Sequence, residues 1–240
     1  MTSGVPGFGT FLIWNYRKVL EILSISGPSQ SRDTIDVTSH GSTDKFREFI
    51  AGPIAGGEVS LDGNLIVGDT YGQIAFHTDV QGGTKRNCFI VMPMAVGGAL
   101  SFEAFAKGFE GSYPFDDKIG ISGSLQVTGK PTLLTAQSTG MTGLTGYAWE
   151  DIEKLPLVIA ETPLPGTYAY TAPVVTTTTH VKITPVADTH TIYAQGVLLD
   201  GESDKIALGA EGTTTDILII VYQANKAPRL YTLSVARAAE

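Results

Sequence analysis

Short alternating runs of apolar and polar residues, separated by turn residues, dominate this chain. Residues 118–128 are the clearest case, because their apolar side chains fall on one face of an extended strand and their polar side chains on the other. The apolar set is Ile119, Ile121, Leu125 and Val127, with Gly123 in step, and the polar set is Ser122, Ser124 and Gln126. This spacing predicts a strand in a sheet that has one solvent-exposed face.

The same patterns predict four further strands and one helix in the first half of the chain. The strands are expected over residues 18–26, 58–67, 87–93 and 100–109. Residues 18–25 also fit a helical period, but the flanking glycines and the turn at 26–29 favour a strand. The helix is expected over residues 70–80, because Asp69 can cap its start and Gly82 and Gly83 can end it.

Residues 36–57 have no hydrophobic period, and we expect a long loop there. A loop of about twenty residues is unusual inside a compact domain and calls for a functional or assembly explanation. Phe46, Phe49 and Ile50 would be exposed to water in an ordinary surface loop, which favours an assembly role.

The composition changes at residues 135–146, where Thr, Ser and Gly dominate as they do in linkers. Short β-rich runs follow, at the spacing of a β-sandwich. They cover residues 168–171, 180–184, 191–194, 205–208, 216–222 and 230–235. We therefore predict a domain over residues 1–140 and a second domain over residues 141–240.

Composition and charge narrow the class of protein. The chain has 240 residues, of which 42% are hydrophobic and 17% charged, which indicates a folded protein and not a disordered one. Its 28 Gly and 12 Pro favour many short strands joined by turns. The net charge of -8 argues against a protein that grips nucleic acid, because such proteins neutralise phosphates with Lys and Arg.

Candidate chemistry is sparse. The 4 His residues have no partner at metal-ligand spacing, and no phosphate-binding loop or nucleophile elbow is present. Cys88 lies in an apolar run and is expected to be a buried hydrophobe. Asp116 and Asp117 are expected in a turn, since adjacent strand residues point to opposite faces. We predict no cofactor, no metal and no enzymatic activity. Arg17, Lys18 and Glu21 interrupt the apolar start of the chain, so no membrane or targeting segment is expected.

Several ordered blocks resemble the major tail tube proteins of long-tailed, siphovirus-type bacteriophages. The blocks are residues 25–29, 36–39, 46–49, 57–61, 86–87 and 127–131. The resemblance implies a tail-tube β-sandwich or barrel with one flanking helix. It also implies hexameric rings that stack into a tube around a tape measure protein, with tail terminator and tip proteins as further partners. Viral DNA would pass through this tube into the host without specific binding.

The resemblance places the protein in the virion tail, assembled in the bacterial host cytoplasm. Strands 18–26 and 118–128 are then candidates for the inner sheet of the tube. Head-to-tail contacts between unlike surfaces generate open filaments, and the segment 36–57 is our candidate for such an inter-ring contact. The predicted assembly residues are Asp36, His40, Phe46, Arg47, Glu48, Phe49, Ile50 and Glu58.

About the last eighty residues resemble the cadherin-like, immunoglobulin-type β-sandwiches of bacterial and phage surface proteins. The likeness lies in residues 183–187, Ile192, the turn at 200–201, and residues 217–222 and 231–235. It implies a decoration domain on the outside of the tube. An alternative is a carbohydrate- or surface-binding module that uses Tyr168, Tyr170 and Tyr193 as an aromatic platform, although such alternating aromatics more often pack across strands.

Overall fold

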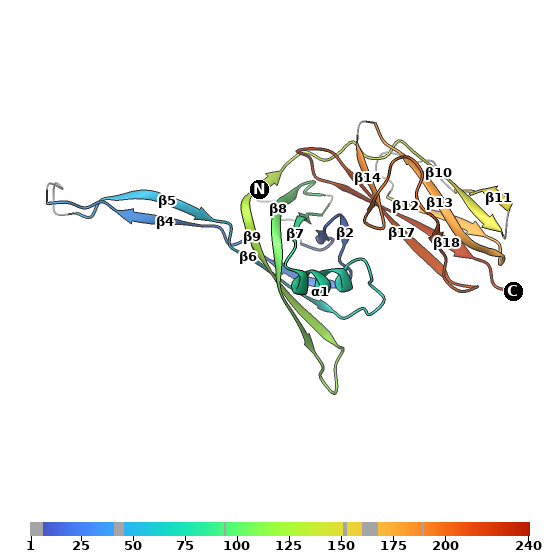
Figure 1. Ribbon diagram of the computed structural model, residues 1–240, viewed down its shortest axis with the longest axis horizontal. Coiled ribbons are helices and arrows are strands. Elements are labelled where there is room, and N and C mark those ends of the chain that lie inside the picture. The colour runs from blue at the N-terminus through green and yellow to red at the C-terminus, as the bar shows by residue number, and fades with distance from the viewer. Residues whose placement is uncertain (1–6, 41–45, 94, 151–152, 160–167, 189) are drawn as a thin grey trace. The chain divides into compact units, whose positions relative to one another are not determined.

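The structure is a computed structural model that describes residues 7–40, 46–93, 95–150, 153–159, 168–188 and 190–240. Strands dominate these residues, and one helix is found among them, so the predicted mainly β fold is confirmed (Figure 1). The chain divides into two compact units. Unit 1 comprises Met1–Lys18, Phe89–Leu100 and Leu133–Glu240, and unit 2 comprises Val19–Cys88 and Ser101–Thr132. The domain boundary at residue 140 stays a prediction.

The largest sheet has seven strands, in the order β2-β1-β7-β8-β9-β6-β3. Their bounds are Phe11–Trp14 for β1, Arg17–Lys18 for β2, Ile22–Ser26 for β3, Glu58–Asn64 for β6, Lys85–Val91 for β7, Ala99–Ser112 for β8 and Gly120–Leu134 for β9. In unit 2, β6 lies between β3 and β9 and runs antiparallel to both. The strands predicted over residues 58–67, 87–93, 100–109 and 118–128 are thus present, with shifted ends.

The alternation predicted for β9 is confirmed. Ile121, Leu125 and Val127 are buried, and Gln126 is exposed. Gly123 belongs to the buried face because a Cβ there would lie 2.9 Å from the Leu61 Cδ1 atom. The prediction was wrong for Ile119, which is 45% exposed, because it lies in the connection before β9, where no sheet face buries it.

The helix α1 (Gln73–Gly82) is positioned by the buried carboxylate of Asp69. One oxygen of this carboxylate accepts a hydrogen bond from the Gly72 amide at 2.9 Å, and the other accepts from the amides of Gln73 and Leu20. Asp69 thus accepts hydrogen bonds at the start of the helix, but the N-cap residue is Gly72, and the helix begins three residues later than expected. Gly83 ends the helix in the left-handed conformation, with φ of 61°.

The remaining strands of unit 1 form a β-sandwich. One sheet has the order β11-β10-β13-β16, and the other has the order β12-β18-β17-β14-β15. Their bounds are Gly143–Glu150 for β10, Glu153–Pro156 for β11, Ala169–Val174 for β12, Thr178–Val186 for β13, Thr191–Ala194 for β14, Val197–Leu198 for β15, Ile206–Ala207 for β16, Thr214–Tyr222 for β17 and Arg229–Arg237 for β18. Side chains from both sheets, including Val181, Ile183, Ile217 and Leu233, are fully buried in the core.

The prediction of a linker over residues 135–146 was wrong. Strand β10 begins at Gly143 within this segment, and Ser138 and Met141 are buried. The Met141 amide donates a hydrogen bond to the Tyr231 hydroxyl at 2.9 Å. The threonines that suggested a linker instead bond to the neighbouring strand, since the Thr142 hydroxyl donates to the Val186 carbonyl. The hydroxyls of Thr142 and Thr145 thus bond to β13 although both residues are exposed.

Strand β17 is apolar on both faces because both faces are covered. Ile217, Ile219 and Val221 point into the sandwich core, whereas Ile220 belongs to a second cluster within unit 1. The other buried members of this cluster are Ile13, Phe89, Val91, Ala99, Leu134 and Ala227. Next to it, the rings of Tyr16 and Tyr193 stack with centroids 3.9 Å apart. The β1–β2 hairpin is thereby packed against the five-stranded sheet.

We predict that replacing Asp69 with alanine destabilises the protein by about 2 kcal/mol or more, because up to three buried amides lose their acceptor. Urea unfolding followed by circular dichroism measures this change. The matched control is Asp116→Ala in the exposed turn after β8, which should change the free energy of unfolding by less than about 0.5 kcal/mol. Equal effects of the two substitutions would contradict the capping role.

Candidate assembly surface

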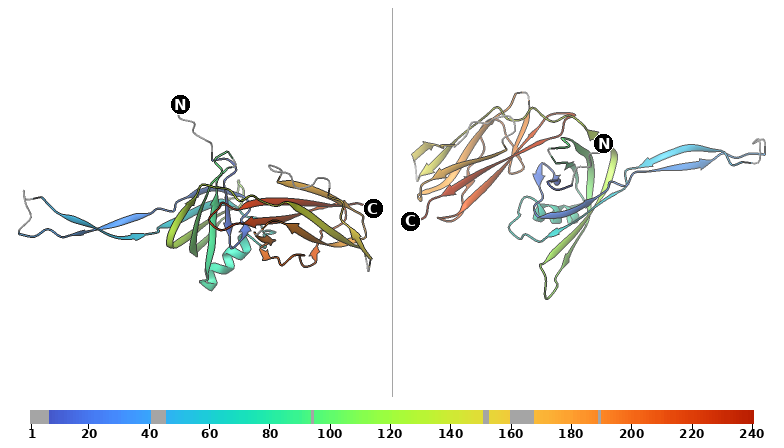
Figure 2. Two further views of the ribbon diagram at one scale, coloured as in Figure 1. Left: turned by 90° about the horizontal axis from the view of Figure 1, so that it is seen from above. Right: turned by 180° about the vertical axis from the view of Figure 1, so that it is seen from behind.

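The segment predicted as a long loop forms most of a two-stranded ribbon instead. Strands β4 (Ser31–Asp36) and β5 (Phe49–Ala55) pair antiparallel with each other and with no other described strand. We call residues 31–40 and 46–55 the arm. Figure 1 shows it extending away from β6 and β9 of unit 2, and Figure 2 shows the same from two further directions.

The loop prediction failed for a physical reason. Alternation of apolar and polar residues marks a strand only when one of its faces is buried. Every residue of β4 is exposed, and so is every residue of β5 except Gly52. No buried face constrains the sequence of the arm, so its strands carry no period of two.

The arm exposes large apolar side chains to water. They are Ile35 at 48%, Val37 at 42%, Phe46 at 77%, Phe49 at 53%, Ile50 at 53% and Ile54 at 56% exposed. An isolated two-stranded ribbon is marginally stable at best in water. Clustered exposed apolar side chains mark interaction surfaces in soluble proteins. The arm therefore has the composition of a surface that another molecule covers.

The structure brings seven of the eight predicted assembly residues together on the arm. Asp36 ends β4 opposite Phe49, and Ile50 pairs with Ile35. Phe46, Arg47 and Glu48 lead into β5, and His40 lies beyond the end of β4. Residues 41–45, between His40 and Phe46, lie outside the described residues. No observation tests the assembly role of these residues, which stays a prediction.

Polar contacts join the two segments of the arm near its far end. The Asp36 carboxylate accepts a hydrogen bond from the Thr38 amide at 2.9 Å, and hydrogen bonding by Thr38 lowers the pKa of Asp36. The Thr38 hydroxyl in turn accepts from the Glu48 amide at 2.9 Å. Arg47 lies 3.9 Å from Asp36, an exposed ion pair that contributes little stability. These contacts fix the register that places Phe46, Glu48 and Phe49 together.

The eighth predicted residue, Glu58, lies apart from the others at the base of the arm. Its carboxylate pairs with Lys107 on β8, and its amide donates to the Ser29 hydroxyl at 3.3 Å. Gly57, with φ of 74°, lies so close to the Ser29 carbonyl that a Cβ would clash. Glu58 therefore belongs to a tight junction that connects the arm to the sheet.

Sequence reasoning missed a second exposed apolar site, in the turn between β8 and β9. Phe115 is fully exposed and Tyr113 is 72% exposed. The predicted turn at Asp116 and Asp117 is confirmed, and the Asp117 carboxylate accepts a hydrogen bond from the Lys118 amide at 2.7 Å. The Tyr113-Pro114-Phe115 sequence could have identified this site. Aromatic residues in a polar turn have no core to pack against, so their exposure could have been expected.

Cys88 and two of the tyrosines considered for sugar binding are used for packing. Cys88 is fully buried, and burial raises the pKa of its thiol. Tyr170 is 2% exposed, and its ring stacks on Tyr231 with centroids 6.4 Å apart. Tyr193 stacks on Tyr16. The rings of Tyr170 and Tyr193 therefore pack against other tyrosines, as the packing interpretation expects.

Metal-binding clusters and membrane-spanning helices are both absent from the described ranges. No group of three or more His, Cys, Asp and Glu side chains gathers there in a way that could hold a metal ion. In the same part of the chain, no helix combines the length and hydropathy required to cross a membrane.

Comparisons with known proteins give one family match. Residues 156–238 match the family described as Cadherin-like beta sandwich domain, in agreement with the resemblance seen in the sequence. No curated protein matches the chain.

Solved tail structures are similar to about half of the chain. One chain in the structure of a virion of a native gene transfer agent particle is 14% identical to this chain. The similarity covers 54% of this chain and 98% of that chain, with a TM-score of 0.43. One chain in the structure of the tail of an empty gene transfer agent particle, refined with C6 symmetry, is 15% identical. The similarity covers 54% of this chain and 98% of that chain, with a TM-score of 0.45. One chain in the structure of the sheath/tube terminator of an extracellular contractile injection system, in the extended state, is 15% identical. The similarity covers 55% of this chain and 97% of that chain, with a TM-score of 0.46.

We predict that the apolar residues of the arm contribute little to the stability of the monomer. Because they are half exposed, Phe49→Ser and Ile50→Ser should each change the free energy of unfolding by less than about 0.5 kcal/mol. Val59→Ala on β6 is the matched control, since Val59 is fully buried, and it should cost about 2 kcal/mol. A large loss of monomer stability in the arm variants would mean that the arm packs on its own chain.

Proposed function

We propose that this protein is a structural subunit of a phage tail tube and assembles with copies of itself into stacked rings. The observation that carries the proposal is the arm, whose phenylalanines and isoleucines find no cover on the described chain. Covering these side chains removes apolar surface from water, and each fully buried large apolar side chain stabilises an assembly by about 1.5–3 kcal/mol.

The geometry of the arm favours an open assembly over a closed dimer. The arm is a projecting ribbon, whereas the other described surfaces of unit 2 are sheet and helix, so an arm that docks on a neighbour makes contact with an unlike surface. Repeated contacts between unlike surfaces are heterologous, and they generate filaments or rings. A tube of stacked rings uses both kinds of contact.

Sheet edges supply a second contact. Strand β3 is the last strand of the seven-stranded sheet, and its residue Leu23 is 62% exposed. An uncovered edge strand invites pairing with another chain. In this proposal the edges of neighbouring subunits pair into a continuous inner sheet of a hexameric ring, which hides them from solvent.

The remaining features of the proposal rest on the resemblance of the sequence blocks to tail tube proteins. The rings surround a tape measure protein, meet terminator and tip proteins at the ends of the tube, and later pass viral DNA into the host. The net charge of -8 suits a conduit, because DNA slides past a wall that does not neutralise its phosphates. The cadherin-like sandwich decorates the outside of the tube, and assembly takes place in the host cytoplasm before release with the virion tail.

Electron microscopy of the concentrated, purified protein tests the proposal. We expect hollow tubes for the unmodified protein, and no tubes for the double variant Phe49→Ser, Ile50→Ser, because that variant lacks two of the apolar contacts of the arm. The double variant should remain a folded monomer by sedimentation. A particle that stays monomeric at every concentration, even with an intact arm, would refute the proposal.

Hydrogen exchange provides an independent prediction. Amides of β4 and β5 should exchange quickly in the monomer, since a two-stranded ribbon opens readily, and at least about 100-fold more slowly in tubes, where a neighbour covers the ribbon. Amides of α1 are the internal control and should be protected in both states. Arm amides that are already protected in the monomer would contradict an intermolecular role.

A further inference from the structure

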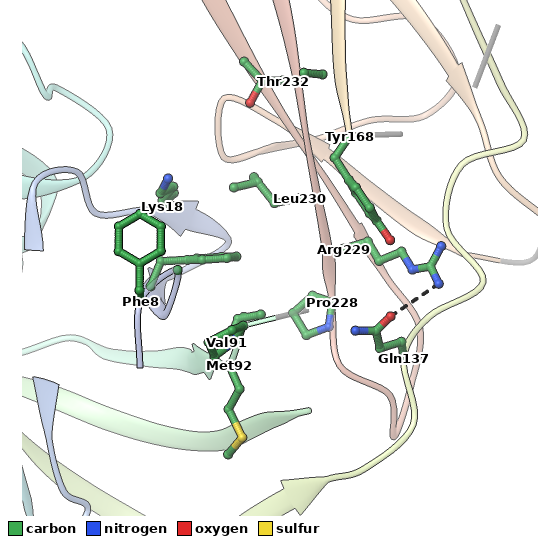
Figure 3. A pocket seen from close by; sticks show the side chains of 14 residues that line it. Phe8, Lys18, Val91, Met92, Gln137, Tyr168, Pro228, Arg229, Leu230 and Thr232 are labelled. Carbon is green, nitrogen blue, oxygen red and sulfur yellow. Dashed lines mark hydrogen bonds between the residues drawn. The ribbon is translucent and has the colours of Figure 1, made fainter. Parts of the chain in front are cut away.

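Unit 1 contains a groove of about 560 Å³ that is lined mainly by apolar side chains. Figure 3 shows Phe8 and Lys18 on one side and Arg229 with Gln137 on the other, with Leu230 and Pro228 between them. Val91 and Met92 from the end of β7 complete the lining. Cavities of about 300–1,000 Å³ hold ligands with several rings, so the groove has room for two aromatic side chains.

The groove is positively charged in a protein whose net charge is negative. Lys18 and Arg229 contribute to its lining, and no Asp or Glu does. The Lys18 ammonium lies 5.3 Å from the centre of the Phe11 ring. The Arg229 guanidinium donates to the Thr139 carbonyl at 3.2 Å and to the Gln137 side-chain oxygen at 3.5 Å. All these partners are neutral, and within the described residues neither cation forms an ion pair with a carboxylate.

A complementary ligand would combine aromatic side chains with a carboxylate. Phe46, Glu48 and Phe49 of the arm provide this combination within four residues, and all three are exposed. The backbone of Glu48 is held by Thr38 and Val37, because its amide donates to the Thr38 hydroxyl and its carbonyl accepts from the Val37 amide. The arm thus carries two exposed rings and one exposed acid within four residues of paired backbone.

The turn between β8 and β9 is a weaker match. Its Tyr113 hydroxyl lies back against Gly111, and its Asp117 carboxylate accepts a hydrogen bond from the Lys118 amide. This leaves Phe115 as its one fully projecting ring. Lys18 and Arg229 lie on opposite sides of an apolar floor, a layout that suits an acid flanked by two rings better than a single ring.

We propose that the groove of one copy receives Phe46, Glu48 and Phe49 from the arm of a second copy. The rings occupy the apolar floor, and the Glu48 carboxylate pairs with Lys18 or Arg229. This inference rests on the proposed function, because it names the surface on which the arm docks during self-assembly.

Site-specific crosslinking tests the contact in the full-length protein. The double variant Arg47→Cys, Thr232→Cys places one thiol beside the docking residues and one in the groove. Oxidation of its assemblies should give a ladder of disulfide-linked oligomers. Cys88 does not compete, because it is fully buried and its thiol pKa is raised by burial. The matched control, Asp116→Cys with Thr232→Cys, places the first thiol in the β8–β9 turn and should give no ladder.

The outcomes separate this inference from the proposed function. Tubes that yield a ladder only in the Arg47→Cys variant support the docking site. Tubes that yield no ladder in that variant, or a ladder only in the Asp116→Cys control, overturn the docking site and leave tube formation intact. Absence of tubes in the unmodified protein refutes the proposed function itself.

A charge exchange supplies a second readout. Lys18→Glu and Glu48→Lys should each raise the concentration required for assembly by about tenfold, the effect of losing roughly 1.4 kcal/mol of attraction. The combined variant restores opposite charges and should assemble at nearly the original concentration. The same exchange is made with Arg229→Glu, and if neither combined variant assembles better than its single variants, the proposed pairing of Glu48 in the groove is overturned.

Discussion

The uncovered ribbon formed by β4 and β5 is the constraint on which the rest of the account depends. A strand pair has two faces, and neither face of this one packs on the described chain. Backbone pairing between two strands does not by itself compensate for the conformational entropy lost when they order. The tight junction at Gly57 and Glu58 nevertheless connects this ribbon closely to the sheet. In the proposed assembly, a second copy of the protein covers the apolar side chains that this ribbon leaves exposed.

Each of the two units has its own internal packing. In unit 2, the Asp69 carboxylate joins the start of α1 to Leu20, two residues before β3, and the alternating face of β9 packs under Leu61. In unit 1, β17 is buried on both faces, and its Ile220 packs with Ile13 and Phe89. The five-stranded sheet of the sandwich therefore shares this second cluster with β1. Residues that are separated by two hundred positions in the sequence stabilise one another.

Much of the fold could be predicted because burial leaves a periodic pattern. The alternation over β9, the glycine stop of α1, and the sandwich strands β12, β13, β14, β16, β17 and β18 followed from the sequence, whereas β10, β11 and β15 did not. The arm could not be predicted as a ribbon, because its strands have no buried face. The polar segment before β10 was misread as a linker, because hydroxyls that bond to a neighbouring strand look the same in sequence as hydroxyls that bond to water. The grouping of Phe46, Glu48 and Phe49 was foreseen, but the groove was not, since its lining comes from distant segments.

A cryo-electron microscopy reconstruction of the assembled protein tests the central claim most directly, because it shows what surrounds the arm. The account predicts stacked rings in which Phe46 and Phe49 of each copy are buried against a different copy. An assembly in which these phenylalanines remain in solvent, or fold back onto their own chain, would contradict it.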